Sequence, residues 1–196
     1  MSEPTENQLE RRTGHGELRV EDARKRRLGG YAIVFNKWSE DLGGFREQIA
    51  PDAVNRTLKE NIDVRAFFDH DSGKVIGRLT AGTLRVEKDK RGFRVEIDVP
   101  DTSVGNDLMV SVERRDITGM SFGFRVAAGG SEWEEDADGN VTRTISDMRV
   151  HEVSVVSMPA YPDTSIAVRS LQAFQAERKP SRLEYLKRLH RQRMAG

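Results

Sequence analysis

Three short segments of the sequence carry the residues best suited to chemistry. His70 lies in FFDHD, Ser121 lies between glycines in GMSFGF, and His151 and Glu152 begin HEVSVVSMPA. A serine nucleophile, a general base and a group that orients the base form a triad, which is defined by geometry rather than by chain order. We therefore take His70, Ser121 and Glu152 as candidate catalytic residues, with His151 as the alternative third member.

The surroundings of Ser121 predict an accessible hydroxyl. In GMSFGF the three large apolar residues alternate with smaller ones, so in a strand they would face the core and Ser121 would lie on the other face, between Gly119 and Gly123. A strand face with only small side chains leaves room for a peptide carbonyl to approach the nucleophile. The same pattern also fits an ordinary serine in a glycine-rich strand.

His70 ends a segment, residues 63–70, whose alternation predicts a strand. Its imidazole would then lie at the rim of the core, and an unperturbed pKa of ~6.5 suits a base that accepts a serine proton near neutral pH. A turn histidine paired with Asp69 or Asp71 fits the residues equally well.

The third position has two candidates, because His151 and Glu152 are adjacent and would point to opposite faces of one strand. Strand alternation puts Glu152 on the face of Val150 and Ser154, and it does not choose between the two candidates. A carboxylate would orient His70 and stabilise its imidazolium. A second histidine could also orient it.

The remaining elements indicate an α+β protein. Strands are predicted near residues 17–21, 27–35, 84–87, 92–99, 119–126, 141–148 and 151–156, with helices after Pro51, over 101–115 with Thr102 or Ser103 as cap, and from about Pro180. Many short strands with few helices predict a mainly antiparallel β-barrel with flanking helices. We expect a polar, disordered tail over 1–16 and a single catalytic domain over 17–169. A basic, partly helical tail should follow over 170–196, with a hinge at residues 170–180.

Composition excludes several classes of site. The chain has no cysteine, and its four histidines are too scattered for a metal site, so neither a metal nor another cofactor is expected. The absence of an apolar run of about 18 residues, or of an apolar leader, predicts a soluble, intracellular protein with no membrane partner. From Arg169 onward the net charge is +6, against −6 for the rest. The acidic body argues against specific binding of nucleic acid.

Five motifs in this order resemble the prohead proteases of HK97-type tailed phages, which are distantly similar to herpesvirus assemblin. They are GYAIVF (30–35), APDAV (50–54), His70-Asp71, GMSFGF (119–124) and EVSVVSMPA (152–160), and the resemblance covers residues 28–169. It implies an assemblin-like barrel and a serine endopeptidase with Ser121, His70 and Glu152, since the glutamate of "EVS" recurs in that family. His151 would instead resemble the Ser-His-His arrangement of the herpesvirus enzymes.

The same resemblance implies where the protein acts and on what. Expected partners are the major capsid protein, with its scaffold-like segment, and the protease itself, inside the assembling procapsid in the host cytoplasm. Backbone N–H groups near Ser121 are the expected oxyanion donors, with Arg125 or Arg169 as helpers. An inactive capsid-assembly or scaffolding protein of the same fold is the alternative. A nucleic-acid-binding barrel is disfavoured, because the strands lack exposed rows of aromatic residues.

Overall fold

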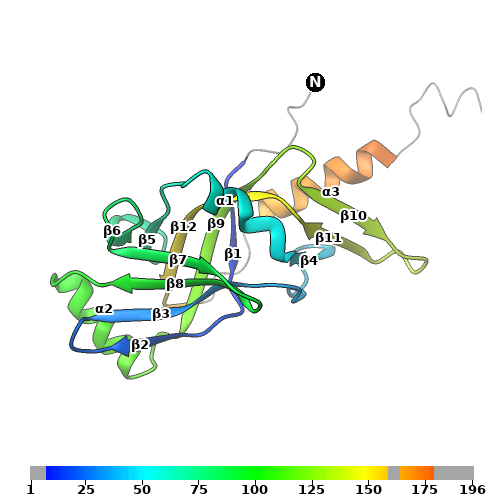
Figure 1. Cartoon of the computed structure of the whole chain (residues 1–196). Helices are drawn as coiled ribbons and strands as arrows, with labels where there is room; N and C mark the ends of the chain where they lie inside the picture. The colour runs from blue at the N-terminus through cyan, green and yellow to red at the C-terminus, as the bar shows by residue number, and fades with distance from the viewer. Residues whose placement is uncertain (1–7, 159–163, 179–196) are drawn as a thin grey trace, which may run out of the picture.

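The computed structural model describes residues 8–158 and 164–178, which form an α+β fold (Figure 1). A five-stranded sheet has the order β1 (Glu10–Thr13), β9 (Gly119–Val126), β12 (Met148–Val156), β5 (Arg65–Phe68) and β6 (Asp71–Arg78). A four-stranded sheet consists of β2 (Leu18–Asp22), β3 (Arg27–Val34), β8 (Gly92–Asp98) and β7 (Leu84–Lys88). A three-stranded sheet consists of β10 (Ser131–Glu135), β11 (Val141–Ile145) and β4 (Phe45–Ile49). The helices are η1 (Pro51–Val54), α1 (Asn55–Lys59), α2 (Ser103–Glu113) and α3 (Thr164–Arg178).

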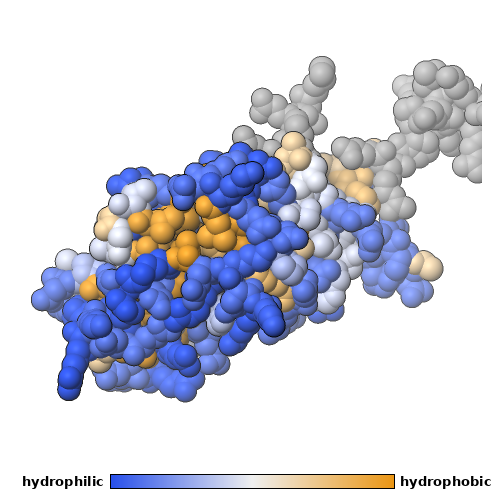
Figure 2. Space-filling model, in the orientation of Figure 1, coloured by the Kyte–Doolittle hydropathy of each residue, from blue (hydrophilic) through white to orange (hydrophobic). Residues whose placement is uncertain are grey.

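One apolar core is shared by the five-stranded and four-stranded sheets. In β8 every second residue is buried (Phe93, Val95 and Ile97), and in β9 the buried apolar set is Met120, Phe122, Phe124 and Val126. This alternation leaves Ser121 and Gly123 on the face of β9 that points away from the core. In Figure 2 most of the visible surface is hydrophilic, with a hydrophobic area over the region where β5 to β7 lie in Figure 1.

The structure confirms the α+β class and several expected elements. The strands predicted near residues 84–87 and 92–99 are β7 and β8, which pair as an antiparallel hairpin. Helix α2 begins at the predicted cap, where the Thr102 side chain accepts a hydrogen bond from Gly105 N. The described strands form three sheets in which no closed barrel is found, so the barrel remains a prediction. Within residues 8–158 and 164–178, no helix has the length and apolar character needed to cross a membrane.

The polar tail predicted for residues 1–16 is wrong for residues 10–13, which form the edge strand β1. This strand pairs with β9 and sends Glu10 and Arg12 to the inner face of the sheet. There Arg12 Nη2 donates to Glu10 at 2.6 Å and Arg12 Nε to Glu47 at 3.1 Å, while Arg143 Nη1 contacts Glu10 at 3.1 Å and Glu47 at 3.0 Å. Two cations and two anions are therefore buried together. Charged residues look like a solvated tail in sequence, but here they find partners inside the protein.

The hinge predicted over residues 170–180 is also wrong as far as the structure describes it, because α3 continues to Arg178. Leu171 is buried in a second apolar cluster with Leu42, Phe45 and Val141, and Phe174 stacks on Trp133 with ring centroids 5.2 Å apart. Figure 1 shows α3 beside β10 and β11. The basic helix expected from about Pro180 lies outside the described residues.

The buried charge cluster of Glu10, Arg12, Glu47 and Arg143 generates a stability prediction. Replacing Glu47 by alanine leaves two buried guanidinium groups with one carboxylate, so Glu47→Ala should lower the free energy of unfolding by about 3 kcal/mol in urea titrations. Asp116→Ala is the matched control, because Asp116 pairs with Arg114 on the exposed surface, and it should change the free energy by less than about 0.5 kcal/mol. Equal effects of the two substitutions would show that the cluster does not hold β1.

Candidate active site

His70 lies in the tight turn between β5 and β6. Phe68 pairs with Asp71, which leaves Asp69 and His70 as a two-residue loop. Both loop residues have positive φ, 52° and 57°, as a type I′ hairpin turn requires. The strand predicted over residues 63–70 therefore ends two residues earlier, and the turn rather than strand alternation sets the direction of the imidazole.

Asp69 fixes this turn to the end of β12. Its backbone N–H donates to Val155 O at 2.9 Å, and its carboxylate accepts from the backbone N–H of Ser157 at 2.7 Å and from the Ser157 hydroxyl. Asp71 instead accepts from Gly73 N at 2.8 Å. Neither aspartate is thus the partner of His70, although the sequence left both possible. The anchoring role of Asp69 has no sequence signal beyond the preference of Asp for turns.

The partner of His70 is Glu152. Nδ1 of His70 lies 2.7 Å from Oε1 of Glu152, and both side chains are largely buried. Burial alone would raise the pKa of Glu152, but the hydrogen bonds and charges of His70 and Arg11 outweigh it and lower this pKa below its ordinary value of 4.5. Glu152 is therefore a carboxylate at neutral pH. A carboxylate only accepts hydrogen bonds, so Nδ1 carries the proton and Nε2 of the neutral ring is left as an acceptor.

Arg11 is a member of this group that the sequence analysis missed. Its Nε donates to the same Glu152 oxygen at 2.8 Å, from a strand 141 residues away in the chain. No local pattern relates Arg11 to Glu152, because the contact depends on β1 pairing beside β9. The Glu152 carboxylate thus has two hydrogen-bond donors beside it: His70, held by the turn, and Arg11, held by the edge strand β1.

A β-bulge at His151 decides which of the two third-position candidates faces His70. Val150 pairs with Phe124 and Glu152 pairs with Gly123, so two residues of β12 occupy one step of β9. The bulge breaks the strict alternation used in the sequence analysis: Glu152 shares its face with Ser154 but not with Val150. His151 is half-buried, its Nε2 has no partner within the described residues, and burial followed by the nearby arginines lowers its pKa. The structure therefore brings Glu152, and not His151, to His70.

Gly123 leaves the space that Glu152 occupies. A Cβ on Gly123 would lie 2.6 Å from Cγ and 2.9 Å from Oε1 of Glu152. Any larger residue would displace the carboxylate from His70, because non-bonded carbon atoms do not approach that closely. The second glycine of GMSFGF thus leaves the space that the carboxylate of Glu152 needs beside His70.

Ser121 lies on the same sheet face but is turned away from His70. Its Oγ donates to the backbone carbonyl of Arg12 at 2.8 Å, while His70 Nε2 is buried without a partner among the described residues. The side chain is 1% exposed, so the open approach expected from the neighbouring glycines is absent in this state. The physical reason is β1, whose Thr13 pairs directly with Ser121.

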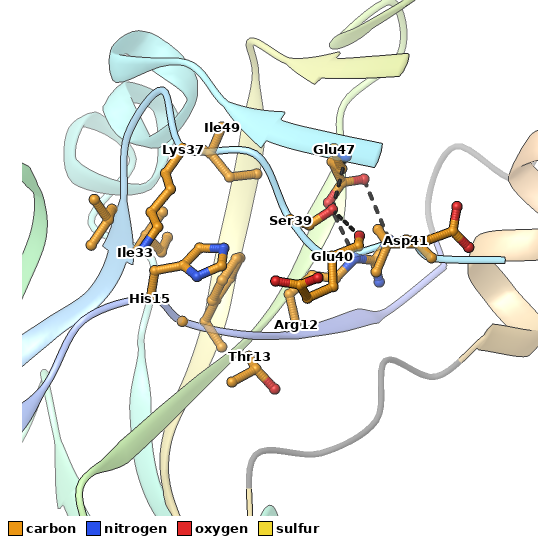
Figure 3. Close-up of a pocket in the computed structure, with 14 residues that line it drawn as sticks. Arg12, Thr13, His15, Ile33, Lys37, Ser39, Glu40, Asp41, Glu47 and Ile49 are labelled. Atoms are coloured by element: carbon orange, nitrogen blue, oxygen red, sulfur yellow. Dashed lines mark hydrogen bonds and ion pairs between the residues drawn. The ribbon is translucent and has the colours of Figure 1, made fainter. Parts of the chain in front are cut away.

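Two cavities adjoin these residues on opposite sides of the sheet. One of about 370 Å³ includes Phe67, His151 and Glu152 in its lining. The other, of about 480 Å³, lies on the inner side of β1 between Phe122 and the loop after β3, and Figure 3 shows Arg12, His15 and Lys37 around it. Only the first cavity is lined by a residue of the His70–Glu152 pair. Arg125 and Arg169 are exposed, and no group of three potential metal ligands occurs within residues 8–158 and 164–178.

The depressed pKa of Glu152 generates a prediction for acid stability. A carboxylate with a lowered folded-state pKa contributes stability above pH 4.5 and loses that contribution as the pH falls through the folded value. Wild type should therefore exceed Glu152→Gln by about 2 kcal/mol at pH 7, and the difference should shrink below pH 4.5 in urea titrations. Glu134→Gln, on the exposed surface of β10, is the control. Curves for wild type and Glu152→Gln that stay parallel on acidification would contradict the ion pair.

Comparison with known proteins identifies the family. No curated protein and no solved structure matches the chain. A family model described as caudovirus prohead serine protease matches residues 15–178, which include the segments that carry His70, Ser121 and Glu152. Because this match spans most of the sequence, the chain belongs to the caudovirus prohead serine protease family.

Proposed function

We propose that the chain is an active serine endopeptidase in which Ser121 is the nucleophile, His70 the general base and Glu152 the group that orients His70. The observation that carries this proposal is the 2.7 Å contact between Nδ1 of His70 and Oε1 of Glu152. It fixes the tautomer in which Nε2 can accept a proton. Nε2 is buried and has no hydrogen-bond partner in residues 8–158 and 164–178, and Ser121 lies on the sheet face that carries Glu152.

Catalysis in this scheme begins with a rotation of Ser121 from the Arg12 carbonyl towards His70. The Oγ proton moves to Nε2 as Oγ bonds to the scissile carbonyl carbon, and the imidazolium then gives the proton to the leaving amine. Water hydrolyses the acyl-enzyme with His70 again as base. Glu152 stays ionised throughout and stabilises the imidazolium. Backbone N–H groups near Ser121, with Arg125 or Arg169, would bind the oxyanion.

The proposed substrates follow from the family. A prohead protease acts on capsid protein in the procapsid, and we propose that this chain cleaves the scaffold-like segment of the major capsid protein and then itself. The proposed site of action is the assembling procapsid in the host cytoplasm. Confinement there would raise the local concentration of both partners, which favours a protease that reaches its substrate without a dedicated high-affinity surface.

One observation favours a second candidate, an inactive capsid-assembly or scaffolding protein with the same fold. In the described state Ser121 binds the Arg12 carbonyl and does not contact His70. A permanent arrangement of this kind would leave the nucleophile inactive. A resting arrangement that opens on substrate binding would not, and apo catalytic hydrogen bonds are often incomplete.

Co-expression of the chain with the major capsid protein, followed by intact-mass analysis, tests the two candidates. Wild type should shorten the capsid protein at a defined position. Ser121→Ala and His70→Ala should each reduce turnover on the order of 10⁴-fold or more, because triad members act as a unit. Ser131→Ala, on β10 and away from the site, should cleave normally.

Each result decides between the candidates. Normal capsid maturation by a folded Ser121→Ala variant would remove Ser121 from the mechanism. A wild-type chain that is folded and assembles with capsid protein, but never shortens it, would favour the scaffolding protein.

A second pair of variants tests the third position. Glu152→Gln should strongly reduce turnover, because an amide does not stabilise the imidazolium of His70. His151→Gln should be milder, because among the described residues the imidazole of His70 is bonded to Glu152 and Nε2 of His151 has no hydrogen-bond partner. The measurement is the initial rate of cleavage of a peptide that spans the mapped cut site. A greater loss in His151→Gln would favour the Ser-His-His arrangement instead.

A further inference from the structure

Ser154 lies in the candidate active site without a role in the triad. It follows Glu152 by two residues on β12, and it is the direct register partner of Ser121 on β9. Residues paired across antiparallel strands project to the same face, with Cβ atoms about 4.5–5.5 Å apart. The two serines and Glu152 therefore share the face that His70 covers.

The side chain of Ser154 is fully buried. Ser154 is 0% exposed, and its Oγ has no hydrogen-bond partner within the described residues. A buried hydroxyl without a partner is unfavourable for folding, and alanine would fill nearly the same space without that cost. His70 Nε2 is likewise buried without a hydrogen-bond partner in the part of the chain that the structure describes. Both atoms lie near Ser121, whose hydroxyl proton points to the Arg12 carbonyl. Together they indicate a hydrogen-bond network that is completed when Ser121 adopts another rotamer.

The donors and acceptors define that state. A hydroxyl has one proton and two lone pairs. Ser121 can rotate its hydroxyl proton from the Arg12 carbonyl to His70 Nε2. The two lone pairs of its Oγ are then still able to accept hydrogen bonds. The Ser154 hydroxyl, across the strand pair, needs an acceptor. One rotation of Ser121 would therefore give both His70 Nε2 and the Ser154 hydroxyl a hydrogen-bond partner.

We propose that Ser154 is a positioning residue whose hydroxyl donates a hydrogen bond to Ser121 Oγ in the active rotamer. This inference rests on the proposed function. The bond holds Oγ towards His70 and stabilises the negative charge that develops on Oγ as its proton moves to Nε2. Ser154 keeps its own proton throughout. The rival assignment, in which Ser154 itself attacks the substrate, is an outcome of the test below.

The absence of cysteine from the sequence permits a direct measurement. Ser121→Cys introduces the single thiol of the chain, whose ionisation can be followed by thiolate absorbance at about 240 nm without cleavage of any substrate. If Ser154 donates to the atom at this position, Ser154→Ala in the same background should raise the apparent pKa of the thiol by about one pH unit. Ser170→Ala, which removes a buried serine on α3, is the matched control and should leave the titration unchanged.

Reaction with a fluorophosphonate, which bonds covalently to activated serines, provides the second measurement. Ser154→Ala should react roughly tenfold more slowly than wild type, with a melting temperature equal to or above that of wild type, because the substitution removes an unpaired polar group. A purely structural role for Ser154 predicts a change in melting temperature without a change in reaction rate. Unchanged values of both the thiol pKa and the reaction rate would overturn the proposal.

The outcomes separate this inference from the proposed function. Peptide mapping that locates the phosphonyl adduct on Ser154 would make Ser154 the nucleophile and overturn its positioning role. A folded wild type that fails to react and fails to cleave capsid protein would overturn the proposed function, while the thiol titration would still decide whether Ser154 donates to position 121.

Discussion

The pairing of β9 with β12 is the interaction on which the candidate site depends. It sets Ser121 opposite Ser154 and Gly123 opposite Glu152, so that polar residues from two distant segments share one face of the sheet. The bulge at His151 is part of this pairing. If the same residues paired with β9 without a bulge, Val150 and Glu152 would lie on one face of the sheet, and one of them would be on the wrong side. Core packing and site geometry therefore constrain the same few residues.

Two further constraints complete the arrangement from outside this strand pair. The left-handed turn at Asp69 and His70 is tied to the end of β12 through Ser157, so the imidazole is placed by backbone geometry rather than by a flexible loop. On the other side, β1 brings Arg11 to Glu152 and is held by the buried charges of Glu10 and Arg12. Unfavourable backbone conformation and buried charge are both tolerated where they hold functional groups in place.

The sequence selects candidate residues for the site, but it does not determine their geometry. His70, Ser121 and Glu152 could be selected because residue types and motifs carry that information, and α2 and the β7–β8 hairpin follow from local patterns. The edge strand β1 could not, because Glu10 and Arg12 are buried against Arg143 of β11 and Glu47 of β4, which no local pattern relates to them. The bulge at His151 sets the direction of the Glu152 side chain, and the turn sets that of His70. Both depend on local backbone conformation, which the alternation of residue types does not reveal.

The contacts of the site also span most of the chain. Arg11 and Glu152 are 141 residues apart, His70 and Glu152 are 82 apart, and Ser121 and Arg12 are 109 apart. During synthesis the segment with Ser121 leaves the ribosome before the strand with Glu152, and contacts of such long range form late in folding. A nascent chain therefore holds a serine and a histidine without the carboxylate that orients them. The order of the segments therefore delays assembly of the candidate site until the strand that carries Glu152 has been synthesised and has paired with β9.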